Sequence, residues 1–319
     1  MGALEAVAPA LAERVAERLF MTPPRHPQPA AERAALEGGE PFALRAAGTT
    51  VRGRRLGEGP AVLLVHGWGG RGGQLAAFAP PLVAAGCSVV AFDGPGHGES
   101  GGRTTNLARL ANTIGAVARR FGGRAAIGHS FGGAALALAL HRGLSLDAAV
   151  LVGAPRTPRG FFDPFCEALG LGDATRDGVR RRVERNVGIP MDDLDLPRFA
   201  GAFAVPALVV HDRADAEVPF EHGAAIAAAW PGAQLLSTDG LGHRRILRHP
   251  GVVSEVASFV LGRMERCGCG RLASAYADGE PRCETCLLAI HLSHPEERAW
   301  RPGLDDFVDR VLRGMETAL

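Results

Sequence analysis

Lysine is missing from this sequence of 319 residues, so arginine supplies all 35 of its basic side chains. The formal net charge is +1, and this near balance excludes an overall field that would hold nucleic acid or an anionic membrane. Apolar runs long enough to span a bilayer are absent, as are the basic and apolar regions of a secretory signal. We therefore expect a cytoplasmic protein without a nucleic-acid or membrane partner. The missing lysine indicates biased genome composition rather than function.

The composition is that of a chain with a full hydrophobic core, since 46% of the residues are apolar and 22% are charged. Apolar runs of strand length alternate with helical stretches, which predicts a parallel sheet covered on both faces, in the α/β class. We expect an N-terminal helix and proline-rich linker over residues 1–40, an α/β domain over 41–263 and a small C-terminal module over 264–319. Between about 156 and 204 the alternation is interrupted.

A serine flanked by glycines stands where a predicted strand turns into a helix. Residues 128–132 have the pattern G-x-S-x-G around Ser130, after an apolar run at 124–127 and before an alanine- and leucine-rich stretch at 134–141. In this context the serine is presented as a nucleophile, which needs a base for its proton and donors for the oxyanion. The alternative is a tight turn in a dinucleotide-binding sheet, but no G-x-G-x-x-G follows the first strand.

The base and the orienting acid are expected in loops that follow later strands. His243 comes after the apolar run 234–237 and a glycine-rich turn, and we assign it as the general base, the alternative being a surface histidine. The strand at 207–211 runs into two aspartates. We expect Asp215 to reach His243, because Asp212 directly follows the strand and is better placed to tie the loop. Asp212 or another carboxylate remains the alternative acid.

Backbone N–H groups are the expected oxyanion donors, so their side chains can vary. Phe131 begins the helix after the nucleophile, where N–H groups have no partner within the helix and the helix dipole favours negative charge. Trp68 lies in the glycine-rich loop that follows the apolar run 61–65. We expect the backbone N–H groups of Phe131 and Trp68 to form the oxyanion hole.

Five short motifs occur in order over residues about 41 to 263, and together they resemble the α/β-hydrolase superfamily. They are H-G-W-G-G from His66, D-G-P-G-H-G-E-S from Asp93, G-H-S-F-G-G from Gly128, D-x-x-D-x-x-V-P from Asp212 and G-L-G-H ending at His243. The resemblance implies the α/β-hydrolase fold, with a mostly parallel central sheet and helices on both faces. It also implies a triad in the order serine, acid, histidine. The histidines His66, His97 and His129 are expected to order loops.

The nucleophile then limits the chemistry that the resemblance implies. Family members that open epoxides or displace halide carry aspartate at this position, so Ser130 implies acyl transfer from a small-molecule carboxylic ester or thioester, without a cofactor. The region at about 156–204 corresponds to a short helical cap, whose Phe161, Phe162 and Phe165 either line an acyl pocket or pack on the core. The alternative function is a non-catalytic binding or regulatory protein with the C-terminal module as its contact surface.

Apolar side chains recur at helical spacing near both ends of the chain. The N-terminal set predicts one amphipathic helix and comprises Leu4, Val7, Leu11, Val15 and Leu19. The C-terminal set predicts another helix and comprises Leu304, Phe307, Val308, Val311 and Leu312. The proline-rich stretch 22–29 is expected to be a linker on the surface, the alternative being a lid over the active site.

Four of the six cysteines form two close pairs, Cys267 with Cys269 and Cys283 with Cys286. Such pairs indicate tetrahedral coordination of a structural Zn²⁺ by four thiolates, in a zinc-ribbon-like appendage. The four sulfurs should converge within about 4 Å, because Zn–S bonds are about 2.3 Å long. The alternatives are an iron–sulfur cluster, disulfides or a redox switch, and free thiols. A nucleic-acid-binding ribbon is disfavoured, because acidic residues are mixed with the arginines of this region.

Overall fold

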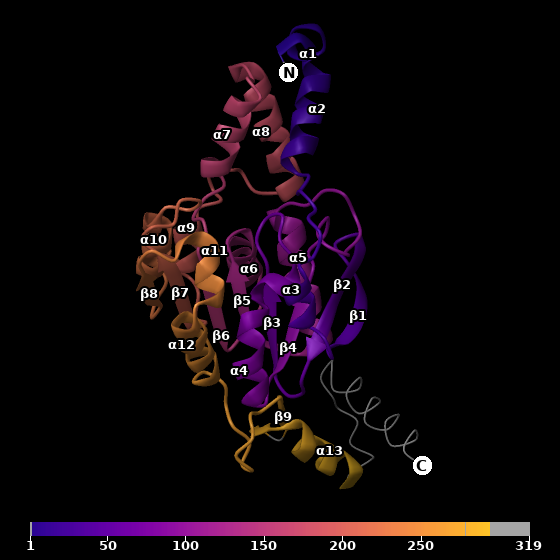
Figure 1. Ribbon diagram of the computed structural model, residues 1–319, viewed down its shortest axis with the longest axis vertical. Coiled ribbons are helices and arrows are strands. Elements are labelled where there is room, and N and C mark those ends of the chain that lie inside the picture. Colours follow the sequence, from indigo (N-terminus) through magenta and orange to yellow (C-terminus); the bar gives the residue numbers. More distant parts are fainter. Residues whose placement is uncertain (1, 278, 294–319) are drawn as a thin grey trace.

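A computed structural model describes residues 2–277 and 279–293 of the chain. Its central sheet has eight strands: β1 Glu40–Ala46, β2 Thr49–Leu56, β3 Ala61–Val65, β4 Ser88–Phe92, β5 Gly123–His129, β6 Ala148–Val152, β7 Ala207–Asp212 and β8 Gln234–Thr238. Their order across the sheet is β1-β2-β4-β3-β5-β6-β7-β8 (Figure 1). β2 is antiparallel to both neighbours, and every pairing from β4 to β8 is parallel.

Helices cover both faces of this sheet (Figure 1). They are α4 Ala79–Ala84, α5 Leu107–Phe121, α6 Phe131–His141, α9 Leu196–Ala200, α10 Phe220–Ala229, α11 Gly242–Arg245 and α12 Pro250–Leu261, with the 3-10 helices η1 Gly72–Phe78 and η2 Ile246–Arg248. α5, α6, α9 and α10 contribute to the hydrophobic core on one face, and η1, α4, η2 and α12 to the core on the other. The mostly parallel sheet with helices on both faces is therefore confirmed.

The central strands are apolar at every position because both of their faces are buried. In β3, Leu63 and Val65 belong to the core beneath α5 and α6, whereas Val62 and Leu64 belong to the core beneath α4 and α12. Successive side chains of a strand point to opposite faces, so each face takes alternate residues. The continuous apolar runs in the sequence are therefore the signature of this two-sided burial.

Four helices stand above the carboxyl ends of the parallel strands (Figure 1). They are α1 Gly2–Val7, α2 Pro9–Phe20, α7 Arg159–Ala168 and α8 Asp173–Val187, and a short α3 Ala30–Ala34 follows α2. The expectation of one continuous N-terminal helix is wrong. Pro9 begins α2 and disfavours helical backbone at the preceding Ala8, whose φ and ψ are −148° and 70°.

The face of α2 that packs against the rest of the protein carries small side chains, not the large apolar ones from which the helix was predicted. Ala12 and Ala16 are fully buried, whereas Leu11 and Leu19 are 44% and 49% exposed. α2 packs against α8 through small side chains, and a Cβ on Gly178 of α8 would overlap a side chain of α2. The two helices therefore approach closely, which a pattern of leucines and valines does not reveal.

A small module lies at the opposite, amino edge of the sheet (Figure 1). It contains the antiparallel strands β9 Ala275–Ala277 and β10 Glu280–Arg282, followed by α13 Glu284–Ser293. The helix expected around Leu304 to Leu312 lies outside the described residues. Within the part of the chain that the structure describes, no helix is both long and apolar enough to cross a membrane.

Candidate active site

Ser130 stands at a sharp turn between β5 and α6. Its φ of 51° and ψ of −121° are unusual for a residue with a side chain, and among the described non-glycine residues only Ala47 shares a positive φ. The turn ends β5 and starts α6 at once, which is the strand-to-helix context of a G-x-S-x-G serine. The backbone thus presents Ser130 at the carboxyl edge of the sheet.

The glycines on either side of Ser130 are required by close packing. A Cβ on Gly128 would lie 2.8 Å from the carbonyl oxygen of Gly132, and a Cβ on Gly132 would overlap two carbonyl oxygens at the end of β3. α6 therefore begins directly against β3. This contact brings Phe131, at the start of α6, beside Trp68 in the loop after β3, with ring centroids 5.3 Å apart in an edge-to-face arrangement.

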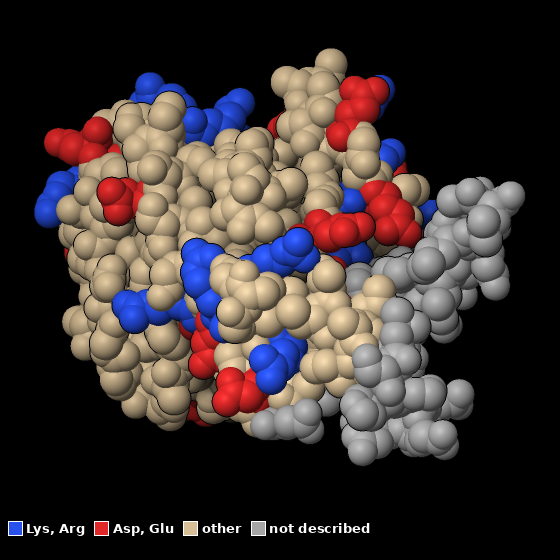
Figure 2. All heavy atoms as spheres, turned by 90° about the horizontal axis from the view of Figure 1, so that it is seen from below, with Lys and Arg blue, Asp and Glu red and all other residues tan. Residues whose placement is uncertain are grey.

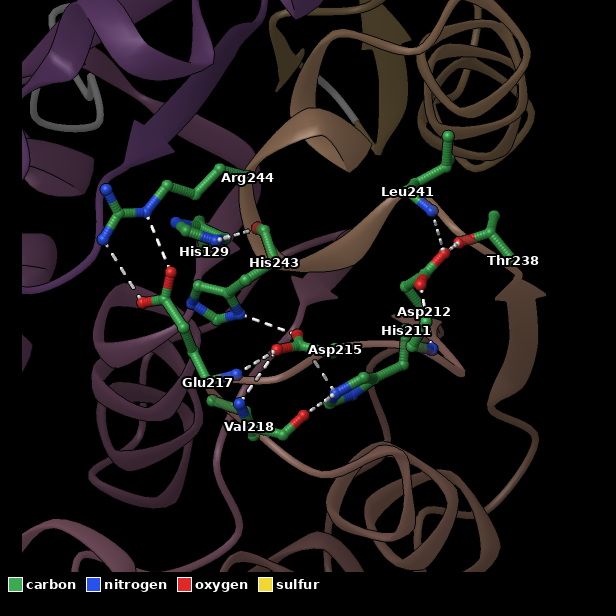
Figure 3. A network of polar contacts seen from close by, with 11 residues as sticks. His129, His211, Asp212, Asp215, Glu217, Val218, Thr238, Leu241, His243 and Arg244 are labelled. Carbon is green, nitrogen blue, oxygen red and sulfur yellow. Dashed lines mark hydrogen bonds and ion pairs between the residues drawn. The ribbon is translucent and has the colours of Figure 1, made fainter.

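His243 and Asp215 are joined by a short hydrogen bond (Figure 3). His243 Nδ1 donates to Asp215 Oδ2 at 2.7 Å, and the backbone N–H groups of Glu217 and Val218 each donate to Oδ1 at 2.9 Å. The two side chains are buried, with 5% and 1% of their surface exposed. Burial opposes ionisation of Asp215, but these hydrogen bonds hold its pKa below the usual value. Since Nδ1 of His243 donates, its Nε2 is free to accept a proton.

Asp212 has a separate set of partners (Figure 3). Its Oδ2 accepts from Thr238 Oγ1 at 2.6 Å and from the N–H of Leu241 at 2.9 Å, and its Oδ1 accepts from the N–H of Ala214 at 3.0 Å. These bonds join the end of β7 to the end of β8 and to the loop before α11. Burial opposes its ionisation, yet the hydrogen bonds lower its pKa. The structure thus brings Asp215 to His243 and leaves Asp212 to tie the loop.

Two further histidines contact the pair. His129 Nε2 donates to the backbone carbonyl of His243 at 3.0 Å, and burial, with the charge of His243, lowers the pKa of His129 to about 3. His211 Nε2 donates to the carbonyl of Val218 at 2.9 Å and lies 3.6 Å from Asp215 Oδ2. Sequence reasoning overlooked His211. Its available signal was a lone histidine in an otherwise apolar strand, directly before the acid loop.

His66 and His97 join the loops that follow β3 and β4. His66 Nε2 accepts from the N–H of Gly94 at 2.8 Å, and His97 Nε2 accepts from the N–H of Gly69 at 3.1 Å. The ring of His97 also meets Trp68 edge to face, with centroids 5.7 Å apart. These contacts fix the loop in which Trp68 lies.

Ser130, His243, Trp68 and Phe131 all open onto one cavity of about 1020 Å³, a volume typical of small-molecule sites. Much of its wall is apolar and comes from the helices above the sheet, including Leu19, Phe20, Phe161, Phe165, Val183 and Val187. Phe162 does not line the cavity and packs instead against the ring of Phe20. The cap phenylalanines therefore divide between the two roles that the sequence left open.

The four cysteines come together far from this cavity, in the module at the amino edge of the sheet. The sulfurs of Cys267, Cys269, Cys283 and Cys286 all lie within 4.8 Å of one another, somewhat wider than the expected 4 Å. Ser130 lies at the carboxyl end of β5, and the seven residues of this strand span about 20 Å between the two edges of the sheet. A cation at the cysteines could not contact a substrate at Ser130.

Residues 62–256 match the Alpha/beta hydrolase family. This match covers more than half of the chain, so the chain belongs to the family. A curated relative from Xanthomonas campestris pv. campestris, named pimeloyl-[acyl-carrier protein] methyl ester esterase, is 31% identical over 243 residues and covers 63% of this chain and 94% of its own. A protein of the same name from Xanthomonas axonopodis pv. citri is 30% identical over 240 residues, with the same coverage. The matched family region ends before Cys267.

Solved structures agree on the fold. The esterase Pf2001 from Pyrococcus furiosus superposes with a TM-score of 0.59 at 17% identity, covering 76% of this chain and 98% of its own. Est1E from Butyrivibrio proteoclasticus, solved with bound ferulic acid, gives a TM-score of 0.56 at 20% identity, covering 70% and 98%. The curated relatives, which are named as esterases, support an ester hydrolase.

Proposed function

We propose that this protein hydrolyses carboxylic esters through an acyl-enzyme on Ser130. The observation that carries the proposal is that Ser130 and His243 line one cavity and that His243 is hydrogen-bonded to the buried Asp215. His243 Nε2 takes the proton of the Ser130 hydroxyl as Oγ attacks the carbonyl carbon, and then gives it to the departing alcohol. A water molecule, deprotonated by the same nitrogen, releases the acid and restores the serine.

The supporting groups act on charge that develops during these steps. Asp215 stays ionised, holds the imidazole with Nδ1 protonated and stabilises the imidazolium that forms. The backbone N–H groups of Trp68 and Phe131 are the proposed donors to the oxyanion of the tetrahedral intermediate. This route requires no cofactor. A metal held by the four cysteines is structural in this proposal, since it lies at the opposite edge of the sheet.

The proposed substrate is an ester with an apolar acyl group. The wall of the cavity is rich in leucine, valine and phenylalanine from α2, α7 and α8, and such a wall favours burial of a hydrocarbon chain. The relatives from Xanthomonas are named for a methyl ester. We therefore favour an ester over a thioester.

The test is turnover of p-nitrophenyl esters and acyl thioesters of increasing chain length. Ser130→Ala and His243→Ala should each lower kcat by at least about 10⁴-fold, since the two groups act as a unit. Ser258→Ala, a change of an exposed serine on α12, is the matched control and should keep full activity. Unchanged turnover by folded Ser130→Ala protein would refute the assignment.

A further inference from the structure

The four cysteine sulfurs form a compact cluster without a disulfide. All four side chains are free thiols, and Cys269 Sγ lies 3.6 Å from Cys283 Sγ. A disulfide bond requires about 2.05 Å. Cys267 and Cys283 are buried.

The segment that carries the cluster has little else to hold it together. β9 and β10 have three residues each, and among the described residues beyond Met264 the largest buried apolar side chains are Leu272 and Leu287. So small a core does not offset the conformational entropy of ordering the segment, and modules of this size depend on disulfides or a metal. The cysteine cluster is the available staple.

We propose that Cys267, Cys269, Cys283 and Cys286 bind one structural Zn²⁺. Zn–S bonds of about 2.3 Å in a tetrahedron separate sulfurs by about 3.8 Å, so the cluster needs to contract by no more than about 1 Å. Four thiolates complete the shell and leave no position for water or substrate. Iron would also accept four thiolates, but a closed site of this kind is typical of zinc.

The surroundings can offset the net charge of −2 that four thiolates and Zn²⁺ carry. Arg282 lies beside the first cysteine pair, since its Nη1 is 3.9 Å from the position of a Cβ on Gly268. Its Nε is buried and, among the described residues, has no hydrogen-bond partner. Figure 2, which views this end of the molecule, shows basic and acidic side chains mixed on the surface. The described residues in this view form no broad basic face suited to nucleic acid.

The ion would fix a module that is docked on the amino edge of the sheet. Glu284 lies 3.8 Å from Arg55 at the end of β2, and the ring of Tyr276 lies 5.8 Å from the guanidinium of Arg124 at the start of β5. Leu272 joins the hydrophobic core beneath the sheet. Loss of the ion should therefore loosen this edge and leave the opposite edge, with Ser130, in place.

The test measures the metal content and thermal stability of the full chain purified after growth with added zinc. Wild type should contain about one zinc per chain, Cys283→Ser should contain almost none, and Cys87→Ala, a buried cysteine outside the cluster, should keep its zinc. Chelation of wild-type protein should lower Tm by several degrees, while Ser130 still reacts with a fluorophosphonate probe at 25 °C.

Three outcomes would overturn the zinc proposal. They are wild-type protein without stoichiometric zinc, chelated protein with an unchanged Tm, and Cys283→Ser protein that keeps its zinc. Stoichiometric iron with its visible absorption would contradict the proposed metal. Chelation uses the unmutated chain, so the proposal stays testable if Cys283→Ser protein does not fold.

A second, independent observation concerns the N-terminal segment, which forms part of the cavity wall. Leu19 and Phe20 of α2 line the cavity, and the Phe20 ring packs against Phe162 and Phe165 with centroids 5.4 and 5.1 Å away. α2 precedes the matched family region, which begins at residue 62. The wall at this point therefore lies outside the region that the family match covers.

The segment after α2 is anchored to the loops around Ser130. Glu32 accepts two hydrogen bonds from Arg71, at 2.6 and 3.1 Å, and the Arg25 guanidinium donates to the carbonyl of Ser100 at 2.8 Å. Pro24 lies against Gly69, next to Trp68, since a Cβ on Gly69 would be 3.0 Å from Pro24 Cγ. Contacts of this kind hold α2 in a fixed place above the cavity.

We infer that Leu19 and Phe20 bind the distal part of the acyl chain, so that α2 sets the preferred chain length. This inference rests on the proposed esterase function. Phe20→Ala should lower the ratio of kcat/KM for p-nitrophenyl octanoate to that for the acetate by about tenfold, through lost apolar contact. Leu11→Ala, on the same helix and outside the cavity, should leave the ratio unchanged.

The outcomes separate the two proposals. Wild-type protein that hydrolyses neither ester would contradict the esterase function itself. Two outcomes with active wild-type protein would contradict only the role of α2. In one, Phe20→Ala has the same octanoate-to-acetate ratio of kcat/KM as wild type. In the other, Leu11→Ala changes this ratio as much as Phe20→Ala does.

Discussion

At the scale of single residues, two neighbouring aspartates are given different tasks by their partners. Asp215 offers one oxygen to His243 and the other to two backbone N–H groups. Asp212 is also buried, but Thr238, Leu241 and Ala214 donate hydrogen bonds to it, and no histidine among the described residues does. Only Asp215 can therefore orient the proposed base.

This difference predicts that aspartate-to-asparagine substitution lowers catalysis at one position and stability at the other. Asp215→Asn should lower kcat by about 10²–10⁴-fold, through loss of tautomer control and of imidazolium stabilisation, with a folded protein. Asp212→Asn should cost about 1–3 kcal/mol of unfolding free energy, because it weakens buried hydrogen bonds, with kcat retained. Ester turnover and urea unfolding of both variants distinguish these effects. Near-normal turnover by Asp215→Asn would place the acid elsewhere.

At the scale of elements, the start of α6 and the end of β3 touch without space for a side chain. Gly132→Ala should destabilise the fold by more than about 2 kcal/mol, because its Cβ would overlap backbone carbonyls that cannot move aside cheaply. Gly115→Ala in α5 is the matched control. Its Cβ would meet only the flexible end of Arg119 at 3.4 Å, and the change should stabilise by about 0.5–1 kcal/mol. Denaturant unfolding measures both, and equal effects would contradict the packing argument.

The same scale shows how far the sequence predicts this structure. The strands were predictable because burial on two faces makes every position of β3 apolar. The break before Pro9 could also have been predicted, because a proline disfavours helical backbone at the residue before it. The packing of α2 through Ala12 and Ala16 could not, because periodicity registers large apolar side chains and close helix contacts use small ones. The position of His211 beside Asp215 depends on the tertiary path of the loop after β7, which no local pattern encodes.

At the scale of the whole molecule, buried histidines link folding to pH. Burial lowers the pKa of His66 to about 4 and that of His97 to about 3, from 6.5. Between pH 6.5 and these lower values the unfolded chain therefore binds more protons than the native one. The contribution of the two histidines to the free energy of unfolding is fully present above pH 6.5 and is lost as pH falls toward 4 and 3. Each group contributes at most about 1.4 kcal/mol per pH unit.

The corresponding prediction compares unfolding free energies at pH 7, 6 and 5. Wild type should lose stability as pH falls, and His97→Gln should lose less, because the variant no longer has this buried imidazole to protonate. His141→Gln, at an exposed position, should follow wild type. Other groups that titrate in this range, including the four cysteines if they release a metal, act in all three proteins and cancel in the comparison. Parallel pH profiles for all three would contradict the account.

The central claim is that the fold activates Ser130, and labelling by a fluorophosphonate probe tests it without knowledge of the substrate. Peptide mapping of the labelled wild-type protein should find the probe on Ser130, with no label on Ser130→Ala and little on His243→Ala protein. Ser258→Ala should be labelled as well as wild type. A folded wild-type chain that does not react, or a Ser130→Ala chain that reacts equally, would contradict the claim and favour a non-catalytic binding protein on this scaffold.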